Sequence, residues 1–420
     1  MHVVFRESHG LEESETPFDL QQSPADLVVL SFSDSDLGAF AAGWHRGDGK
    51  LPTLRLANLT ALKHPLSVDT YVEQTLDGAK GILIRLIGGY AYWSYGLQQV
   101  EALCRAKGIA LAVLPADGRT DVRLDEVSTL PVSTLRRLSH LCDRGGEVAA
   151  QAALAQLSLA AGLYAGPVRG AKGIPIVGAW TPEHGVTCPV AAFVPDSEKP
   201  RVLISFYRAY LTSADMAPIT ALFESLRAKG CDVVALFAPS LKAPDAATWL
   251  RRQTLALKPD AIINATSFSG KGADGTSPLD AAGVPVFQVA LSTSRRKAWD
   301  EEERGLSPTD LAMHIVLPEI DGRIFSGVTS FKEPRKKDPD LQFARFAHRV
   351  EPPRIEAITK RVIRWITLGQ NNNADLTPAI VLSTYPGKDW QMAHAVGLDA
   401  IASTDAILDD LNNAGWTTQS

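Results

Sequence analysis

The sequence predicts an α/β fold made of successive Rossmann- or flavodoxin-like modules, each a parallel sheet flanked by helices. Two observations predict it. Short β-branched segments alternate with amphipathic helical segments, and a polar turn follows each predicted strand. Apolar residues make up 45% of the chain and charged residues 21%, which is ordinary for a globular protein. The 420 residues are enough for two to four domains.

Residues 1–170 are predicted to form an N-terminal α/β module. Its expected strands are ADLVVLSF (25–32), TLRLAN (53–58), KGILIRLI (80–87) and GIALAVLPA (108–116). A long helix from about Ser133 to Gly162 closes the module. The Gly- and Pro-rich residues 171–198 follow as a largely irregular linker.

Residues 199–335 are predicted to form a second α/β module. Its expected strands are RVLISF (201–206), CDVVALF (231–237), DAIINAT (260–266) and VPVFQVAL (284–291), with helices near 216–229 and 244–257. Residues 336–375 are expected to be a helical connector and linker, with a helix at 354–368. Residues 376–420 then begin a third α/β unit, with a strand at 377–386 and a helix at 398–416. Because a lone strand and helix cannot cover both faces of a sheet, we expect this unit to be truncated.

Composition and charge argue against several classes of function. The formal charge of -5 gives the chain no general attraction for nucleic acid or for anionic membranes. No run of eighteen apolar residues is present, and the polar, acidic first residues do not resemble a signal peptide. The four cysteines are too scattered for a CxxC site and predict buried thiols in a reducing compartment. We therefore expect a cytoplasmic protein.

The segment LSPTDLAMHIVLPEIDG (306–322) offers candidates for metal binding and proton transfer. Ser307 before Pro308 is a helix-start signal, so a helix is expected from Pro308 to about Leu317, ending at Pro318. Glu319 and Asp321 would then lie just beyond the helix. They could serve as a general base and as tentative metal ligands together with His314, or they could simply cap the turn. His314 could equally be a packing residue.

Further residues after predicted strands could bind a ligand, because ligands of open α/β sheets lie beyond the carboxyl ends of the strands. Aromatic faces could stack on a flat ligand, and arginines could pair with carboxylates. The simpler interpretations are helix packing for the aromatic residues and a solvated turn for the arginines. The candidates are Tyr90, Trp93, Arg208, Tyr210, Arg295, Arg296 and, in a glycine-bounded loop near the end, His394.

Several uncommon motifs resemble one family. The chain reads LPEIDGR followed by FSGVTSFK between Leu317 and Lys332, and PVFQVALSTSRRKAW just before. With LIRLIGGYAYWSYG, ISFYRAYLTSADMAPITAL and STYPGKDWQMAHAVGLDAIAS elsewhere, the chain resembles the amino-terminal part of the large subunit of aerobic cobaltochelatase, the CobN type. It is more distantly similar to the large subunit of magnesium chelatase. The resemblance covers essentially the whole chain, although the family's large subunit is far longer.

The resemblance implies a tetrapyrrole-binding subunit that inserts Co2+ into hydrogenobyrinate a,c-diamide in aerobic cobalamin biosynthesis, with Glu319 functionally important. It also implies that ATP and Mg2+ are used by separate AAA+ partner subunits, and the chain indeed has no GxxxxGK[ST] motif. Such a chain would be inactive alone. The alternatives are a magnesium-chelatase-type subunit, a two-lobed α/β small-molecule-binding protein and a glycosyltransferase.

Overall fold

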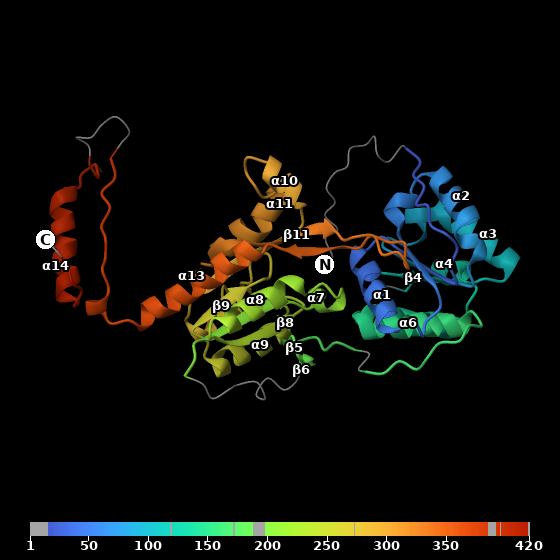
Figure 1. Cartoon of the computed structure of the whole chain (residues 1–420), viewed down its shortest axis with the longest axis horizontal. Coiled ribbons are helices and arrows are strands. Elements are labelled where there is room, and N and C mark those ends of the chain that lie inside the picture. Colours follow the sequence, from blue (N-terminus) through green and yellow to red (C-terminus); the bar gives the residue numbers. More distant parts are fainter. Residues whose placement is uncertain are drawn as a thin grey trace. The chain divides into compact units, whose positions relative to one another are not determined.

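The computed structural model describes residues 16–117, 120–170, 173–187, 198–272, 274–384, 392–394 and 396–418. The chain divides into two compact units, one ending at Thr359 and the other beginning at Lys360. The first unit contains two sheets flanked by helices, drawn in blue to green and in green to orange in Figure 1. The predicted α/β class is confirmed.

The four predicted strands of the N-terminal module form one parallel sheet in the order β2-β1-β3-β4. Both faces of this sheet are covered, which is why its strands are apolar along their whole length. Val28 and Leu30 of β1 join one core cluster, whereas Leu27 and Val29 join the other. The elements are β1 (Leu27–Ser31), α1 (Asp34–Arg46), β2 (Leu54–Asn58), η2 (Leu59–Leu62), α2 (Pro65–Gln74), η3 (Leu76–Gly78), β3 (Gly81–Leu86), η4 (Tyr90–Trp93), α3 (Ser94–Lys107), β4 (Ala110–Pro115), α4 (Val122–Val127), α5 (Val132–Arg144) and α6 (Glu147–Ala160).

The long helix predicted over 133–162 is two helices, α5 and α6. Gly145 and Gly146 separate them with φ angles of 66° and 84°. A right-handed helix cannot continue through this left-handed backbone, which glycine adopts without a steric penalty. A Cβ on Gly145 would lie 2.6 Å from that of Thr212, so the break also allows a close approach to the second module.

The second sheet has eight strands in the order β12-β11-β10-β9-β7-β8-β5-β6. The strands from β11 to β8 are parallel, whereas β12, β5 and β6 are antiparallel additions. Strand order reverses between β7 and β9, which marks the topological switch point where ligands of such sheets bind. The elements are β5 (Gly178–Thr181), β6 (Gly185–Thr187), β7 (Arg201–Tyr207), α7 (Arg208–Thr212), α8 (Ala217–Ala228), β8 (Asp232–Ala238), α9 (Pro244–Leu257), β9 (Ala261–Asn264), η6 (Pro278–Ala282), β10 (Val286–Ser292), α10 (Arg296–Glu301), α11 (Pro308–Leu311), the π turn η7 (Ala312–Val316), α12 (Leu317–Ile320), β11 (Ile324–Pro334), β12 (Phe346–Val350) and α13 (Pro352–Gln370).

Two segments predicted to be connections contribute strands to this sheet. Residues 171–198, expected to be a linker, supply the hairpin of β5 and β6, in which β5 pairs with β8. Residues 336–375, expected to be a helical connector, supply β12, which pairs with β11. The strands in these segments are only three to five residues long, so pairing with a neighbouring strand decides their conformation more than local propensity does.

The residues between β11 and β12 pack against the N-terminal module. Leu341 is buried in the core cluster that also holds Leu27 and Val29. The Arg55 guanidinium donates to the carbonyl of Asp340 at 2.7 Å, and the Gln22 amide donates to that of Gln342 at 3.0 Å. The segment therefore belongs structurally to both modules.

The second unit contains η8 (Asn373–Asp375) and α14 (Ala400–Asn413), which the Asp399 side chain caps. The helix agrees with the prediction for 398–416. The strand predicted over 377–386 is not formed in its described part, residues 377–384, because no neighbouring strand there satisfies its backbone groups. Residues 385 and 386 lie outside the described residues. Among the described residues, no helix is long and apolar enough to cross a membrane.

Candidate functional site

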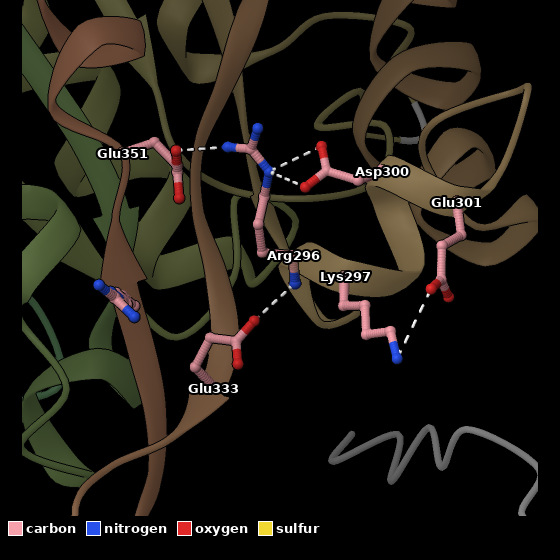
Figure 2. Close-up of a pocket in the computed structure, with 7 residues that line it drawn as sticks. Arg296, Lys297, Asp300, Glu301, Glu333 and Glu351 are labelled. Carbon is pink, nitrogen blue, oxygen red and sulfur yellow. Dashed lines mark hydrogen bonds and ion pairs between the residues drawn. The ribbon is translucent and has the colours of Figure 1, made fainter.

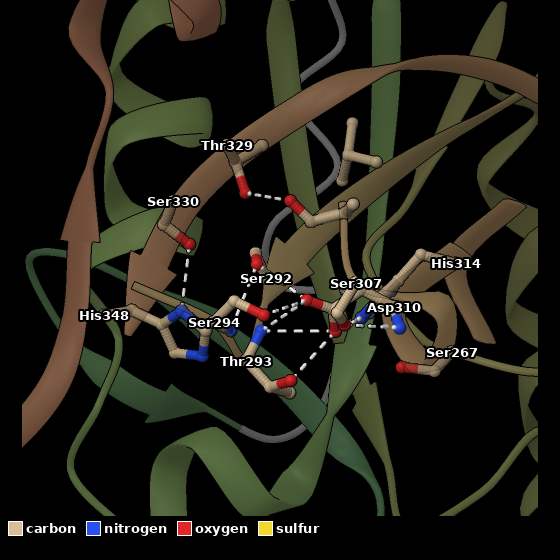
Figure 3. Close-up of polar contacts among 12 residues, drawn as sticks. Ser267, Ser292, Thr293, Ser294, Ser307, Asp310, His314, Thr329, Ser330 and His348 are labelled. Atoms are coloured by element: carbon tan, nitrogen blue, oxygen red, sulfur yellow. Dashed lines mark hydrogen bonds and ion pairs between the residues drawn. The ribbon is translucent and has the colours of Figure 1, made fainter. Parts of the chain in front are cut away.

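The buried carboxylate of Asp310 is the centre of a polar cluster at the carboxyl end of β10 (Figure 3). It accepts hydrogen bonds from Ser292 Oγ at 2.7 Å and from Thr293 Oγ1 at 3.0 Å. The Thr293 amide and the Ser294 hydroxyl also donate to it. Ser307 Oγ accepts from the Asp310 amide at 3.1 Å, which confirms the predicted start of the helix. Asp310 thus ties the helix to the strand.

His314 lies one turn after Asp310 and points toward it (Figure 3). Its Nε2 is 3.8 Å from Asp310 Oδ1, and its Nδ1 has no hydrogen-bond partner among the described residues. Burial lowers the pKa of His314, and the Asp310 carboxylate opposes this shift. The imidazole is therefore held neutral in the interior.

The helix that begins at Pro308 does not end at Pro318, as predicted, but continues to Ile320. The π turn η7 allows this, because the Leu317 amide bonds to the carbonyl of Ala312, five residues back. The wider turn accommodates the proline ring, which would clash in a regular helix. Glu319 consequently lies inside α12, where it is exposed to solvent, rather than beyond the helix.

Asp321 has a structural role in the next turn. Its carboxylate accepts hydrogen bonds from Ser269 Oγ at 2.7 Å and from the Gly270 amide at 2.6 Å. Glu319 is exposed, Asp321 binds this loop and His314 faces Asp310, so the three predicted metal ligands do not converge. The described part of the chain contains no group of three or more His, Cys, Asp or Glu side chains placed to hold a metal ion.

His348 on β12 is a buried imidazole that sequence reasoning missed. Its Nδ1 is 3.0 Å from Ser330 Oγ, and its backbone amide donates to the Asp215 carboxylate at 3.1 Å. Burial lowers the pKa of His348 to about 4, against the opposing effect of Asp215. FAHRV (346–350) shows no regular alternation of apolar and polar residues, and it lies in a segment that the sequence predicts to be a connector.

Tyr210, predicted to face a ligand, instead packs inside the second module. Its ring makes an edge contact with His348 at 5.8 Å between centroids, and burial raises the pKa of its hydroxyl. The nearby Arg208 donates to the carbonyls of Ile174 and Pro175, both at 2.9 Å. These two residues stabilise the first turn after β7.

A cavity of about 500 Å³ lies between α10, β11 and the edge strand β12 (Figure 2). Arg296 lines it, but its guanidinium is bound by Asp300 at 2.9 Å and by Glu351. Arg295 lies over the ring of Phe346, 5.4 Å from the centroid. The structure thus gives both arginines partners within the protein. The cavity is lined by Arg296, Lys297, Asp300, Glu301, Glu333, Arg349 and Glu351.

The aromatic candidates of the N-terminal module pack on its own sheet. Trp93 is buried and donates from Nε1 to the carbonyl of Leu62 at 2.8 Å, and Tyr90 is partly buried against the same core. These contacts agree with helix packing, the simpler interpretation. His394 is exposed. It belongs to the second unit, whereas the other candidate residues belong to the first.

Comparison with known proteins identifies the family. A family model described as CobN/Magnesium Chelatase matches residues 150–420. The aerobic cobaltochelatase subunit CobN of Sinorhizobium sp is 34% identical over 430 residues, covering 99% of this chain and 33% of that protein. The CobN subunit of Pseudomonas aeruginosa is 33% identical, with the same coverage. A magnesium-chelatase subunit of Rhodobacter capsulatus is 27% identical over 51% of this chain and 19% of its own length.

Among solved structures, the catalytic subunit of cobaltochelatase from Mycobacterium tuberculosis matches with a TM-score of 0.70 at 26% identity. The match covers 94% of this chain and 31% of that one. The chain thus spans about a third of the length of the curated cobaltochelatase relatives that it matches. Because the family model covers more than half of the chain, the chain belongs to the CobN/magnesium chelatase family.

Proposed function

We propose that this chain is part of the tetrapyrrole-binding large subunit of an ATP-dependent cobaltochelatase that inserts Co2+ into hydrogenobyrinate a,c-diamide. The observation that carries the proposal is coverage: the two CobN relatives match 99% of the chain, whereas the magnesium-chelatase relative from Rhodobacter capsulatus matches 51%. The cobalt ion is a substrate here, as is the ring.

We also propose that AAA+ partner subunits, rather than this chain, bind and use ATP and Mg2+, and that the reaction takes place in the cytoplasm. The sequence supports the first part because it contains no GxxxxGK[ST] motif for binding a nucleoside triphosphate. Free thiols support the cytoplasmic location. Cys104, Cys142 and Cys231 are unpaired in the structure, as in proteins of a reducing compartment, and Cys188 lies outside the described residues.

Insertion of a metal removes protons from the ring nitrogens, which requires a general base. We assign this role to Glu319, because it is a solvent-exposed carboxylate on α12, in the second module beside the loop that follows β9. Asp310 and His314 belong to the same irregular helix, and the buried position of His314 does not favour direct contact with Co2+.

A spectroscopic titration tests the proposal. The purified chain is mixed with hydrogenobyrinate a,c-diamide and the visible absorption of the ring is followed, with a porphyrin of similar charge in a parallel titration. We expect a saturable shift with the corrinoid at micromolar protein and a weaker one with the porphyrin. Preference for the porphyrin would favour a magnesium-chelatase-type function, and no shift with either would refute a ring site on this chain.

A further inference from the structure

The loop after β9 presents an aromatic side chain from a strained backbone. Phe268 has a φ of 66°, and 40% of its surface is exposed. A bulky residue seldom adopts this left-handed conformation, and where one does, the strain is often linked to function. The folded chain therefore keeps an aromatic ring at the surface at a cost in backbone energy.

Hydrogen bonds hold this conformation from three sides. The Phe268 amide donates, at 2.7 Å, to the carbonyl of Met313, a residue of the π turn. On one side, the Ser267 carbonyl accepts from the Tyr207 hydroxyl at 2.6 Å. On the other, Ser269 and Gly270 donate to the Asp321 carboxylate. Because the neighbours on both sides are bound, Phe268 is presented by a fixed loop rather than by a freely moving one.

The same loop runs beside an exposed apolar edge of the helix. Val316 and Ile320 lie one turn apart and are 54% and 63% exposed. Lys271 donates from Nζ to the carbonyl of Ile320 at 3.0 Å, which places an ammonium group at the end of this edge. We call Phe268, Val316 and Ile320 the apolar shelf. It is bordered by the Lys271 ammonium and the Glu319 carboxylate.

The position of the shelf is that of a ligand site. It is formed by the loop after β9 and by the helix that packs on the carboxyl end of β10, next to the reversal of strand order between β7 and β9. Ligands of open α/β sheets bind beyond the carboxyl ends of strands at such a reversal.

We propose that the apolar shelf is the surface on which one face of the macrocycle rests, with Phe268 stacked on the ring. This inference depends on the proposed function, since it concerns the same substrate. Charge complementarity supports this occupant: Lys271 matches the carboxylate arms at the rim of the ring, and Glu319 matches ring N–H groups or the incoming cation. Phe268 is thereby a residue for ring binding, separate from Glu319 as the base.

Phe268→Gly tests the proposal, because it should weaken binding of the corrinoid without lowering the melting temperature. Glycine adopts the left-handed backbone without strain, so the melting temperature should stay equal or rise. The dissociation constant for hydrogenobyrinate a,c-diamide should rise by about tenfold, as expected for loss of one stacking aromatic ring. Phe268→Trp should retain binding, because it restores an aromatic face. Lys271→Gln should weaken binding in a way that depends on salt concentration.

Leu255→Ala is the matched control, because Leu255 is 52% exposed on α9 and lies outside the shelf. It should leave the dissociation constant unchanged. If the wild-type chain binds the corrinoid and Phe268→Gly binds it equally well, the shelf proposal is wrong while the proposed function stands. A lower melting temperature for Phe268→Gly, with unchanged binding, would show a packing role. If the wild-type chain does not bind the corrinoid, this chain carries no ring site, and the shelf proposal is wrong.

Discussion

At the scale of single residues, the second module holds two neutral imidazoles in its interior. His348 bonds to Ser330, and His314 faces Asp310. Burial lowers the pKa of both imidazoles because the charged form loses its water. The charged or titratable groups that influence His348 are Asp215, Lys332, His314 and Asp310.

These shifts predict that acid destabilises the protein before its carboxylates titrate. The pKa of His348 is about 4 in the folded chain and 6.5 in a model compound, so between these values the unfolded state binds more protons. Stability is therefore lost as the pH falls through this window, by roughly 1 kcal/mol between pH 7 and 5.5 from His348 alone. Urea unfolding at both pH values measures the loss, and His348→Gln should reduce it. An equal loss in the variant would contradict the assignment.

Glu319→Gln should separate binding from chemistry. Because Glu319 is exposed and glutamine has nearly the same shape, the variant should fold. It should still bind the corrinoid, because the apolar shelf is unchanged. In the complete subunit with the proposed ATPase partners, cobalt insertion should fall by at least about 100-fold, the usual contribution of a general base. Glu303→Gln, at another exposed acidic residue, is the control. Undiminished insertion by Glu319→Gln would remove the catalytic role.

Several residue roles followed from the sequence, and others did not. Ser307 was identifiable as an N-cap because the signal is local. Tyr210, Arg208 and Arg296 occupy the expected positions after strands, yet bind protein partners supplied by distant parts of the chain. Such partners depend on tertiary structure, so sequence position alone could not distinguish a ligand-binding arginine from a structural one.

At the scale of elements, the apolar strands were predictable and the irregular helix was not. Strands buried on both faces are apolar throughout, which made β1 to β4 and β7 to β10 readily visible in the sequence. Pro318 predicts the end of a helix, because a proline inside a regular helix is unfavourable. The π turn lets the helix continue past Pro318, and nothing in the local sequence indicates that a π turn forms.

Pro318→Ala tests whether the proline maintains the π turn. Without its ring, a regular α-helix becomes more favourable between Ala312 and Ile320, and the Met313 carbonyl returns to the helix. The Phe268 amide would then lose its acceptor, so its hydrogen exchange should become about tenfold faster or more. Pro308→Ala, at the first helical position, should not change this rate. Unchanged exchange in Pro318→Ala would mean that packing alone maintains the turn.

At the scale of the whole molecule, the order of the modules was predictable but their limits were not. Periodicity places α/β units along the chain, whereas sheet membership depends on pairing across long distances. The sequence therefore predicts connections at residues 171–198 and 336–375, although these segments supply β5, β6 and β12. The resemblance of the motifs supplied the family, which composition and periodicity alone could not have identified.

The segment between β11 and β12 has a consequence for synthesis of the protein. A ribosome that has completed β10 has made every strand and helix of the N-terminal module. It has not yet made Leu341, which lies in the core of that module, or Gln342, whose carbonyl accepts from the buried Gln22 amide. During translation the N-terminal module therefore lacks one of its core side chains, and one acceptor for the Gln22 amide, until most of the second module has been synthesised.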